Sequence, residues 1–277
     1  MTMQKTKKLN QTPVSARVKL ASILTDGLLV DRNYLKNKGI ERPLVDYYLR
    51  SGGLEAVGRG VYRRPGPDLK WQHVVYSLQV LNYAIYVGGR SALDHQGLAH
   101  YLPLGEKEII HLYSANKLPA WLHEMKTNAC FKQHSCSLFS KEAGEMGLTT
   151  LPFGGWDWPL SYATRERALI EYVDDLPNKA ALEIADKYME SAITLRPDLL
   201  MSLLQACKRV KTKRLFLWLA QRHKHAWFSR LDIPNVELGS GKRVIFKEGV
   251  LDKQFNITVP SEYLDGGNGD GAEQPLF

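Results

Sequence analysis

Arginine side chains gather in a short stretch near the N-terminus, and their spacing favours contact with a nucleic acid. Arg42 and Arg50 lie in one short segment, and Arg59, Arg63 and Arg64 follow shortly after it. A guanidinium group can bond bidentately to a guanine edge in the major groove, and it also pairs with phosphate oxygens. We therefore predict that the first two residues contact base edges or phosphates, and that the other three contact phosphates or a minor groove.

Four further side chains belong to the same predicted DNA-binding surface. Tyr47 is suited to packing on a sugar or a thymine methyl group, and Asp46 to orienting an arginine or accepting a hydrogen bond from cytosine. Lys36 and Lys38 would contact the flanking phosphate backbone. For each of these side chains, an ordinary solvated position on the surface is the alternative.

The net charge of the chain is concentrated in the same region. The whole sequence has a formal net charge of +8, and its first 66 residues contain thirteen lysines and arginines against five acidic residues. That segment accounts for the whole excess, and the charges of the remaining residues cancel. Because phosphate neutralisation needs a local cationic surface, this concentration favours a polyanionic partner.

Short helices and a hairpin are the elements that must position these side chains. We expect helices at residues 15–27, 31–38 and 42–51, and strands at 54–57 and 61–64. Asp31 is a candidate N-cap, Pro43 belongs in a first helical turn, and Gly58-Arg59-Gly60 is a hairpin turn signal. Three helices followed by a hairpin with a cationic tip are typical of a winged helix-turn-helix; a generic small helical domain is the alternative.

The chain has 277 residues, a length that favours two domains. A turn-rich segment at residues 65–68 marks the expected boundary. The predicted division is a basic flexible tail (1–14), a winged helix-turn-helix domain (15–66), a larger domain (67–262) and a flexible tail (263–277). We expect an α+β fold in which the larger domain is a mixed, mainly helical α/β domain.

Within the larger domain, periodicity predicts several helices and a few strands. The expected helices are residues 71–81, 89–101, 164–173, 180–191, 198–207 and 211–221, and the expected strands are 83–87 and 109–113. Residues 153–159 are interpreted as an irregular loop. A second hairpin is expected from residues 236–238 and 244–247, around Gly239-Ser240-Gly241.

A second cationic run lies between Gln205 and Leu231, where the sequence has no acidic residue. Apolar residues alternate with its charges, which indicates a helix with one buried side. The cationic side chains are Lys208, Arg209, Lys211, Lys213, Arg214, Arg222, Lys224 and Arg230. A solvated helix face, a second nucleic-acid contact and a docking face for an acidic partner or RNA all remain open.

No arrangement of residues predicts catalysis, and we expect no catalytic residue, metal site or cofactor. Cys130, His134 and Cys136 lack a fourth metal ligand and form no CxxC pair, so they are interpreted as structural. The stretch Gly239-Ser240-Gly241-Lys242 lacks the first glycine and the final serine or threonine of a phosphate loop. His223 and His225 have neither the helical spacing of a metal pair nor the partners of a catalytic triad. The chain is therefore not expected to be an enzyme.

The composition also bears on the compartment. The sequence contains no run of about 18 apolar residues, so we expect no membrane partner. Residues 1–13 are basic and polar, without the apolar core of a secretory signal. Three cysteines cannot form a disulfide framework, and an odd number fits a reducing compartment. We expect a cytoplasmic protein.

Four stretches, taken in order, point to one family. They are Gly-Gly-Leu-Glu-Ala-Val-Gly-Arg-Gly-Val-Tyr (52–62), Gly-Gly-Arg-Ser-Ala-Leu-Asp-His-Gln-Gly-Leu (88–98), Glu-Arg-Ala-Leu (166–169), and Leu-Gly-Ser-Gly-Lys-Arg (238–243) continuing to Ile-Thr-Val-Pro (257–260). This ordered set resembles the AbiEi family, the antitoxins of type IV abortive-infection toxin–antitoxin systems. The first stretch is shared by many winged helices, and the set of four is more specific. The similarity extends over most of the chain.

The resemblance implies a protein with two roles. Its winged helix would bind repeats in double-stranded promoter DNA and repress its own operon. Its larger domain would counteract a nucleotidyltransferase-like toxin of the AbiEii type, and direct contact with that toxin stays open because the family usually neutralises without a stable complex. We predict that the antitoxin surface is the basic helix, with Lys208, Arg209, Lys211, Lys213, Arg214, Arg222 and Lys224.

Three other interpretations compete with the autorepressing antitoxin. The protein could be a stand-alone winged-helix transcriptional regulator. It could be a nucleic-acid enzyme that uses the winged helix for targeting, which would need clustered acidic or metal-binding residues in the larger domain. It could also be an adaptor whose winged helix binds protein, although the charge of the first 66 residues argues against this.

Overall fold

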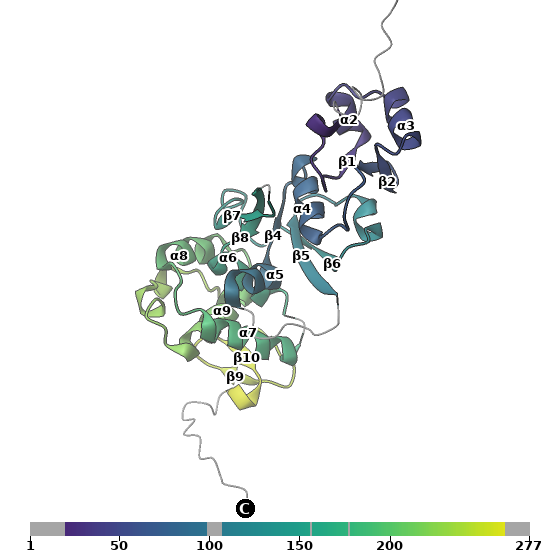
Figure 1. The fold of residues 1–277 in the computed structure, drawn as a ribbon. Helices are drawn as coiled ribbons and strands as arrows, with labels where there is room; N and C mark the ends of the chain where they lie inside the picture. The colour runs from purple at the N-terminus through teal and green to yellow at the C-terminus, as the bar shows by residue number, and fades with distance from the viewer. Residues whose placement is uncertain (1–19, 99–106, 156, 177, 264–277) are drawn as a thin grey trace, which may run out of the picture.

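The computed structural model describes residues 20–98, 107–155, 157–176 and 178–263. A winged-helix part lies at one end of the molecule, a five-stranded sheet lies in the middle, and a helical part lies at the other end (Figure 1). This arrangement confirms the predicted α+β class, with a winged helix followed by a larger mixed domain.

Short helices and a three-stranded antiparallel sheet make up the N-terminal part. Its elements are a helical turn at residues 20–23, β1 (Val30–Asp31), α2 (Arg32–Asn37), α3 (Arg42–Arg50), β2 (Glu55–Gly58) and β3 (Val61–Arg63). The strand order is β1-β3-β2. The first predicted helix is seen only at its C-terminal end, since residues 15–19 lie outside the described residues.

Local signals in the sequence explain where these elements begin and turn. The Asp31 carboxylate accepts a hydrogen bond from the Tyr34 backbone N–H at 2.7 Å and caps α2. Pro43 lies in the first turn of α3. Gly60 has a φ of +77°, a left-handed conformation that favours glycine, and it turns the chain between β2 and β3. The predicted N-cap, proline and hairpin turn are thus confirmed.

One apolar cluster holds the winged helix together. Leu24, Leu35, Tyr48 and Tyr62 are almost completely buried in it, and Trp158 joins them from the larger part of the chain. Because α3 packs through Val45 and Tyr48, its opposite side is free to face outward.

The larger part is built around a mixed five-stranded sheet. Its strands are β4 (Ile85–Val87), β5 (Glu108–Ser114), β6 (Ala129–Ser135), β7 (Leu148–Phe153) and β8 (Trp158–Ala163), in the order β6-β5-β4-β8-β7. The central strand β4 pairs antiparallel with β5 and parallel with β8. At the edges, β5 and β6 are parallel, whereas β7 and β8 form an antiparallel hairpin.

Some helices pack against this sheet and the others form the helical end of the molecule (Figure 1), and a small two-stranded ladder lies near the end of the described residues. The helices are α4 (Trp71–Val80), α5 (Gly89–Leu93) with a π-helical turn (Asp94–Leu98), α6 (Arg165–Asp174), α7 (Lys179–Ser191), α8 (Pro197–Ala206) and α9 (Val210–His223). Short 3-10 turns are Ala120–Glu124, Phe228–Arg230, Ile233–Asn235 and Ser261–Tyr263. The ladder joins β9 (Val250–Asp252) to β10 (Ile257–Val259) in antiparallel register.

Several details of the larger part differ from the predictions. Residues 153–155 and 157–159 are not an irregular loop, because they form the turn and the strand ends of the β7–β8 hairpin, and residue 156 lies outside the described residues. The hairpin expected at residues 236–247 is absent from the described residues, and the pairing occurs instead between β9 and β10. The helix expected at 89–101 changes geometry after Leu93, and Gly97 has a φ of +86°. Its last residues, 99–101, lie outside the described residues.

Helix α4 and the β7–β8 hairpin connect the two parts of the molecule. Trp158 stacks on Tyr76 of α4 at a ring-centroid distance of 4.2 Å. The Leu29 backbone N–H donates to the Ser77 hydroxyl at 2.8 Å. Gly27 lies so close to His73 that an added Cβ would sit 2.6 Å from the imidazole ring. The predicted domain boundary falls between β3 and α4, and the winged helix packs directly on the element that follows it.

A buried ion pair ties α6 to the centre of the sheet. Arg167 and Glu171 have side chains only 1% exposed, and the Arg167 Nε lies 2.9 Å from the Glu171 carboxylate. The Arg167 Nη1 donates to the backbone oxygens of residues 143, 144 and 146, and its Nη2 donates to the Tyr86 hydroxyl at 2.8 Å. The Glu171 carboxylate also accepts from the Gly89 backbone N–H at 3.0 Å. The pair therefore links β4, α5, α6 and the segment before β7.

A second buried arginine organises the C-terminal segment. Arg214 on α9 is 2% exposed, and it donates to the backbone oxygens of Leu238, Gly239, Gly241 and Asn256 at 2.6–3.2 Å. Burial lowers the pKa of Arg214, although the surrounding carbonyl dipoles point toward its charge. This guanidinium replaces the predicted hairpin as the feature that shapes residues 238–241.

Replacing Arg214 with methionine is expected to lower the free energy of unfolding by about 2–3 kcal/mol, because buried carbonyl groups would lose their donor. The segment at residues 238–249 should then become accessible to a protease, which limited proteolysis followed by mass spectrometry would detect. Lys211→Met is the matched control, since Lys211 lies on the same helix and is exposed. Equal unfolding curves and equal cleavage for the two variants would contradict the assigned role of Arg214.

Candidate nucleic-acid interface

Helix α3 presents one polar side to solvent, as the sequence predicts. Val45 and Tyr48 are buried, whereas Arg42 and Arg50 are exposed. Tyr47 is also exposed, at 37%. Neither arginine has a hydrogen bond or an ion pair with another described residue. Both guanidinium groups are therefore available to an external partner.

Helix α2 adds further cations beside α3. Lys36 and Lys38 are exposed, and the Lys38 ammonium lies 5.7 Å from the centre of the Tyr34 ring. Arg32, at the start of α2, donates from Nε to the Tyr62 hydroxyl at 2.9 Å. That hydrogen bond is the main reason why the pKa of Arg32 is raised, and Asp46 on α3 adds to it.

The position of Arg32 was not predicted as part of the interface. Its side chain is held by β3 of the hairpin and interacts with Asp46 of α3, so it links three elements of the winged helix. Asp46, predicted to orient an arginine, has Arg32 as a charged neighbour. The only sequence signal for this contact was the position of Arg32 next to the capping Asp31.

The arginines of the hairpin fall into two groups. Arg59 is exposed at the tip, beside Gly60. The Arg63 side chain is 11% exposed, forms an ion pair with Glu55 and donates to the Pro67 backbone oxygen at 2.8 Å. Arg64 pairs with Asp26 at 2.8 Å and donates to the Leu24 backbone oxygen at 3.2 Å. Because protein groups engage Arg63 and Arg64, we assign them to holding the hairpin in place and Arg59 to external contact.

The basic helix α9 does not form the continuous cationic surface that the sequence predicts. Every residue from 212 to 220 is buried, with Lys213 and Arg214 only 4% and 2% exposed. The cause is packing on several sides, since α9 contacts α6, α7 and β10. Lys213 donates to the Glu237 backbone oxygen at 3.0 Å, so its charge is also satisfied inside the protein.

Other cations of the same run are engaged in ion pairs. Arg209 forms an ion pair with Asp174. Arg222 lies 3.3 Å from Asp186 and over the rings of Trp218 and Tyr263. Burial alone would raise the pKa of Asp186, but bonds to His223 and Arg222 lower it. Lys208, Lys211 and Lys224 are the members of the predicted antitoxin surface that stay exposed without such an ion pair among the described residues. The prediction that all seven cations form one exposed surface is therefore wrong.

The candidates for phosphate or metal chemistry in the sequence are dispersed. The loop containing Gly239 and Gly241 points backbone oxygens at Arg214, which is opposite to the N–H groups that a phosphate needs. Cys130 is exposed, whereas Cys136 is half-buried near Tyr86, and burial raises its pKa. His134 lies beside His111 and Asp175 rather than with the cysteines.

The helices of the described residues are all too short or too polar to cross a membrane.

Two family models match the chain. Residues 107–260 match the model described as "Transcriptional regulator, AbiEi antitoxin, Type IV TA system". Residues 15–104 match the model described as "Transcriptional regulator, AbiEi antitoxin N-terminal domain". These descriptions name a family of regulators and antitoxins rather than a family of enzymes. No match was found among curated proteins.

Among solved structures, the chain is similar to the crystal structure of the RV2827C protein from Mycobacterium tuberculosis. The TM-score is 0.53, the sequence identity is 13%, and the similarity covers 89% of this chain and 92% of that chain. At this identity the comparison bears on the fold alone, and it supports the winged helix and the larger domain as one arrangement.

Proposed function

The chain belongs to the AbiEi family of type IV antitoxins and transcriptional regulators, and we propose that it binds promoter DNA of its own operon through the winged helix and represses transcription. The observation that carries this proposal is the outward side of α3, where Arg42 and Arg50 are exposed and have no partner among the described residues. Arg59 at the hairpin tip, and Lys36 and Lys38 at the C-terminal end of α2, would contact the phosphate backbone.

The arrangement of α3 is suited to a major groove. A helix buried on one side through Val45 and Tyr48 can enter the groove without losing its support. Two exposed arginines would supply the bidentate contacts to guanine or the phosphate contacts that orient the helix. Tyr47 would pack on a sugar or a thymine methyl group, and Asp46 would orient Arg32 rather than approach a phosphate.

We further propose that the larger domain, residues 67–262, counteracts a nucleotidyltransferase-like toxin of the AbiEii type in the cytoplasm. The family descriptions support an antitoxin role, and the match at residues 107–260 lies within this domain. The exposed lysines Lys208, Lys211 and Lys224 are the part of the predicted antitoxin surface that can still contribute to such a role.

A single cell-based experiment tests both roles. A strain would carry the upstream region of the protein's own gene fused to a reporter, together with the gene of an AbiEii-type toxin under an inducible promoter. Expression of this protein is expected to lower reporter output and to restore growth during toxin induction. A variant with Arg42, Arg50 and Arg59 replaced by alanine should lose repression, because the DNA contacts are removed, while it still restores growth.

The two readouts separate the alternatives. Repression without rescue of growth would indicate a stand-alone regulator. Unchanged repression by the triple variant would contradict the assignment of α3 and the hairpin tip to DNA.

A further inference from the structure

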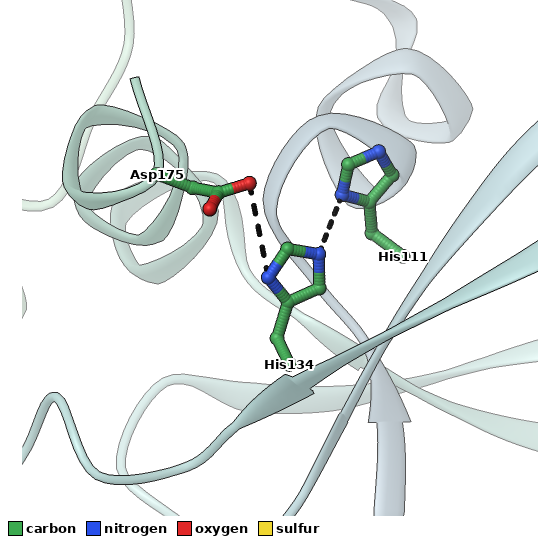
Figure 2. Close-up of side chains that lie close together, drawn as sticks. All are labelled: His111, His134 and Asp175. Atoms are coloured by element: carbon green, nitrogen blue, oxygen red, sulfur yellow. Dashed lines mark hydrogen bonds and ion pairs between the residues drawn. The ribbon is translucent and has the colours of Figure 1, made fainter. Parts of the chain in front are cut away.

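Two histidines and an aspartate from distant parts of the sequence meet at one edge of the sheet. His111 lies on β5, His134 lies on β6, and Asp175 caps the C-terminal end of α6. Tyr113 and His134 are register partners in the parallel pair β5–β6, so His111 lies diagonally across from His134 on the same face. Figure 2 shows the three side chains converging.

The distances are those of a connected cluster. His111 Nδ1 lies 2.9 Å from His134 Nε2, and His134 Nδ1 lies 3.8 Å from the Asp175 carboxylate. One potential ligand atom from each of the three residues lies within 4.8 Å of the others. We propose that His111 and His134 bind a divalent transition-metal ion such as Zn²⁺ between their facing nitrogens, and that Asp175 orients the His134 ring from its Nδ1 side.

The surroundings hold the imidazole rings in fixed positions. The His134 ring lies between His111 and Tyr113, with ring-centroid distances of 4.9 and 4.8 Å and interplanar angles near 15°. The His111 backbone N–H donates to the Ser91 hydroxyl at 2.9 Å. The backbone N–H of Asp175 bonds to the last turn of α6. Fixed ligands favour metal binding because little conformational freedom is lost.

The protonation of the rings also suits a metal. Burial lowers the pKa of His111 to about 4, and it lowers the pKa of His134 as well. Burial therefore disfavours the protonated form of both rings, and a metal ion binds the neutral form of an imidazole. The facing nitrogens, His111 Nδ1 and His134 Nε2, lie 2.9 Å apart, so one of them carries the proton between them. For both nitrogens to bind the ion, each ring would carry its single proton on its other nitrogen, which is a change of tautomer, and a small rotation of the rings would make room for the ion.

Asp175 has a defined role in the proposed site. At 3.8 Å the Asp175 carboxylate is an ion-pair neighbour of His134 Nδ1, and a small shift would let it accept the Nδ1–H and leave Nε2 for the ion. A carboxylate in that place is common beside the histidine ligands of zinc proteins. Lys132 competes for this carboxylate, because its ammonium lies 2.8 Å from Asp175. The Lys132 side chain is 52% exposed, so it can move into solvent when an ion binds.

Imidazole nitrogens favour Zn²⁺, Ni²⁺ or Co²⁺ over Mg²⁺ or Ca²⁺, which prefer oxygen ligands. Water would occupy the remaining coordination positions. Such an ion would link β5 and β6 to the end of α6, so binding should also raise the thermal stability of the protein.

Titration calorimetry with ZnCl₂ on the full chain, purified without a histidine tag, tests the proposal. We expect one ion to bind per chain, and a rise in the melting temperature. His134→Gln should abolish this binding. Asp175→Asn should weaken it by about 10–100-fold, as is typical when the carboxylate beside a metal-bound histidine is lost. Lys132→Met should strengthen it, because the competing cation is removed.

Controls separate this site from surface histidines. His123→Ala is the matched control, since His123 is exposed and lies outside the cluster, and it should bind Zn²⁺ like the parent. Circular dichroism would establish that the variants are folded, and Asp175→Asn and Lys132→Met change exposed side chains. Absence of Zn²⁺ binding by the parent, or equal binding by the parent, His134→Gln and Asp175→Asn, would overturn the proposal.

Discussion

Arg167→Met is expected to lower the free energy of unfolding by about 3–5 kcal/mol, the largest loss that we predict for a single substitution. The substitution removes the cation from a buried pair in which both side chains are only 1% exposed. Glu171 would keep a carboxylate among apolar groups with bonds only from Tyr86 and Gly89. The stacking of the guanidinium on Phe139, at 4.7 Å from the ring centre, would also be lost.

The pH dependence of this loss gives a second test. Burial already raises the pKa of Glu171, and removal of Arg167 would raise it further. An acid whose pKa is higher in the folded state binds its proton more tightly there. Ionising it therefore destabilises the folded protein, and this destabilisation is absent below the unfolded pKa and grows as the pH rises toward the folded pKa. The difference in the free energy of unfolding between Arg167→Met and the parent, measured by urea denaturation, should therefore be smaller at pH 5 than at pH 8.

Two variants serve as controls for the buried pair. Arg165→Met changes an exposed arginine on the same helix and should change stability by about 0.5 kcal/mol or less. The double variant Arg167→Met/Glu171→Gln removes both charges and should be more stable than Arg167→Met alone. If the double variant were as unstable as the sum of its single variants, the electrostatic explanation would be wrong.

Elements that begin with local signals could be predicted from the sequence. Asp31 caps α2 and Pro43 opens α3 through contacts within a few residues, so both helices were placed correctly. The side of α3 that faces solvent could also be predicted, because the apolar residues of this helix recur with helical spacing. The ion pair of Arg63 with Glu55 could also have been found, because the predicted hairpin places these residues opposite each other.

Elements that depend on distant partners could not be predicted. The β7–β8 hairpin contains Pro152 opposite Pro159 and a glycine-rich turn, so its sequence resembles a loop. It forms a hairpin in which Trp158 stacks on Tyr76, far away in the sequence. Strand β6 is largely polar, and it is ordered by its parallel pairing with β5. Sequence periodicity carries no information about either contact.

Buried cations are the clearest failure of sequence reasoning. A lysine or arginine in a helix is expected to face solvent, and Lys213 and Arg214 were interpreted in that way. Their partners are backbone oxygens 24 to 42 residues further along the chain, which no local pattern identifies. The cluster of His111, His134 and Asp175 was missed for the same reason, because it requires the strand order of the sheet.

The same contacts give a structural meaning to the stretches that resemble the AbiEi family. The glycine pair at 88–89 lies against Glu171, so close that a Cβ on Gly88 would sit 2.5 Å from its carboxylate. Arg167 is part of the third stretch, and the carbonyls that bind Arg214 belong to the fourth. The third stretch contains one buried arginine, and the fourth binds the other through its backbone carbonyls. We infer that these stretches define the fold rather than a binding surface.

Loss of DNA affinity in the triple variant Arg42→Ala/Arg50→Ala/Arg59→Ala is the second large effect that we expect. For double-stranded DNA, the logarithm of the binding constant falls with the logarithm of the salt concentration, by about 0.9 for each phosphate that is neutralised. If each of the three arginines contacts one phosphate, the slope should become shallower by about 3. Affinity near 0.1 M salt should fall by at least about 100-fold, since each lost contact costs on the order of 1 kcal/mol or more.

Arg63→Ala is the matched control for this prediction. Arg63 is engaged by Glu55 and the Pro67 backbone oxygen, so its loss should lower the melting temperature and leave the salt dependence close to that of the parent. Fluorescence anisotropy with a labelled promoter duplex at several salt concentrations would measure both slopes. The assignment fails if Arg63→Ala changes the slope as much as Arg42→Ala does. It also fails if the triple variant keeps both the affinity and the slope of the parent, since the exposed arginines would then contact neither bases nor phosphates.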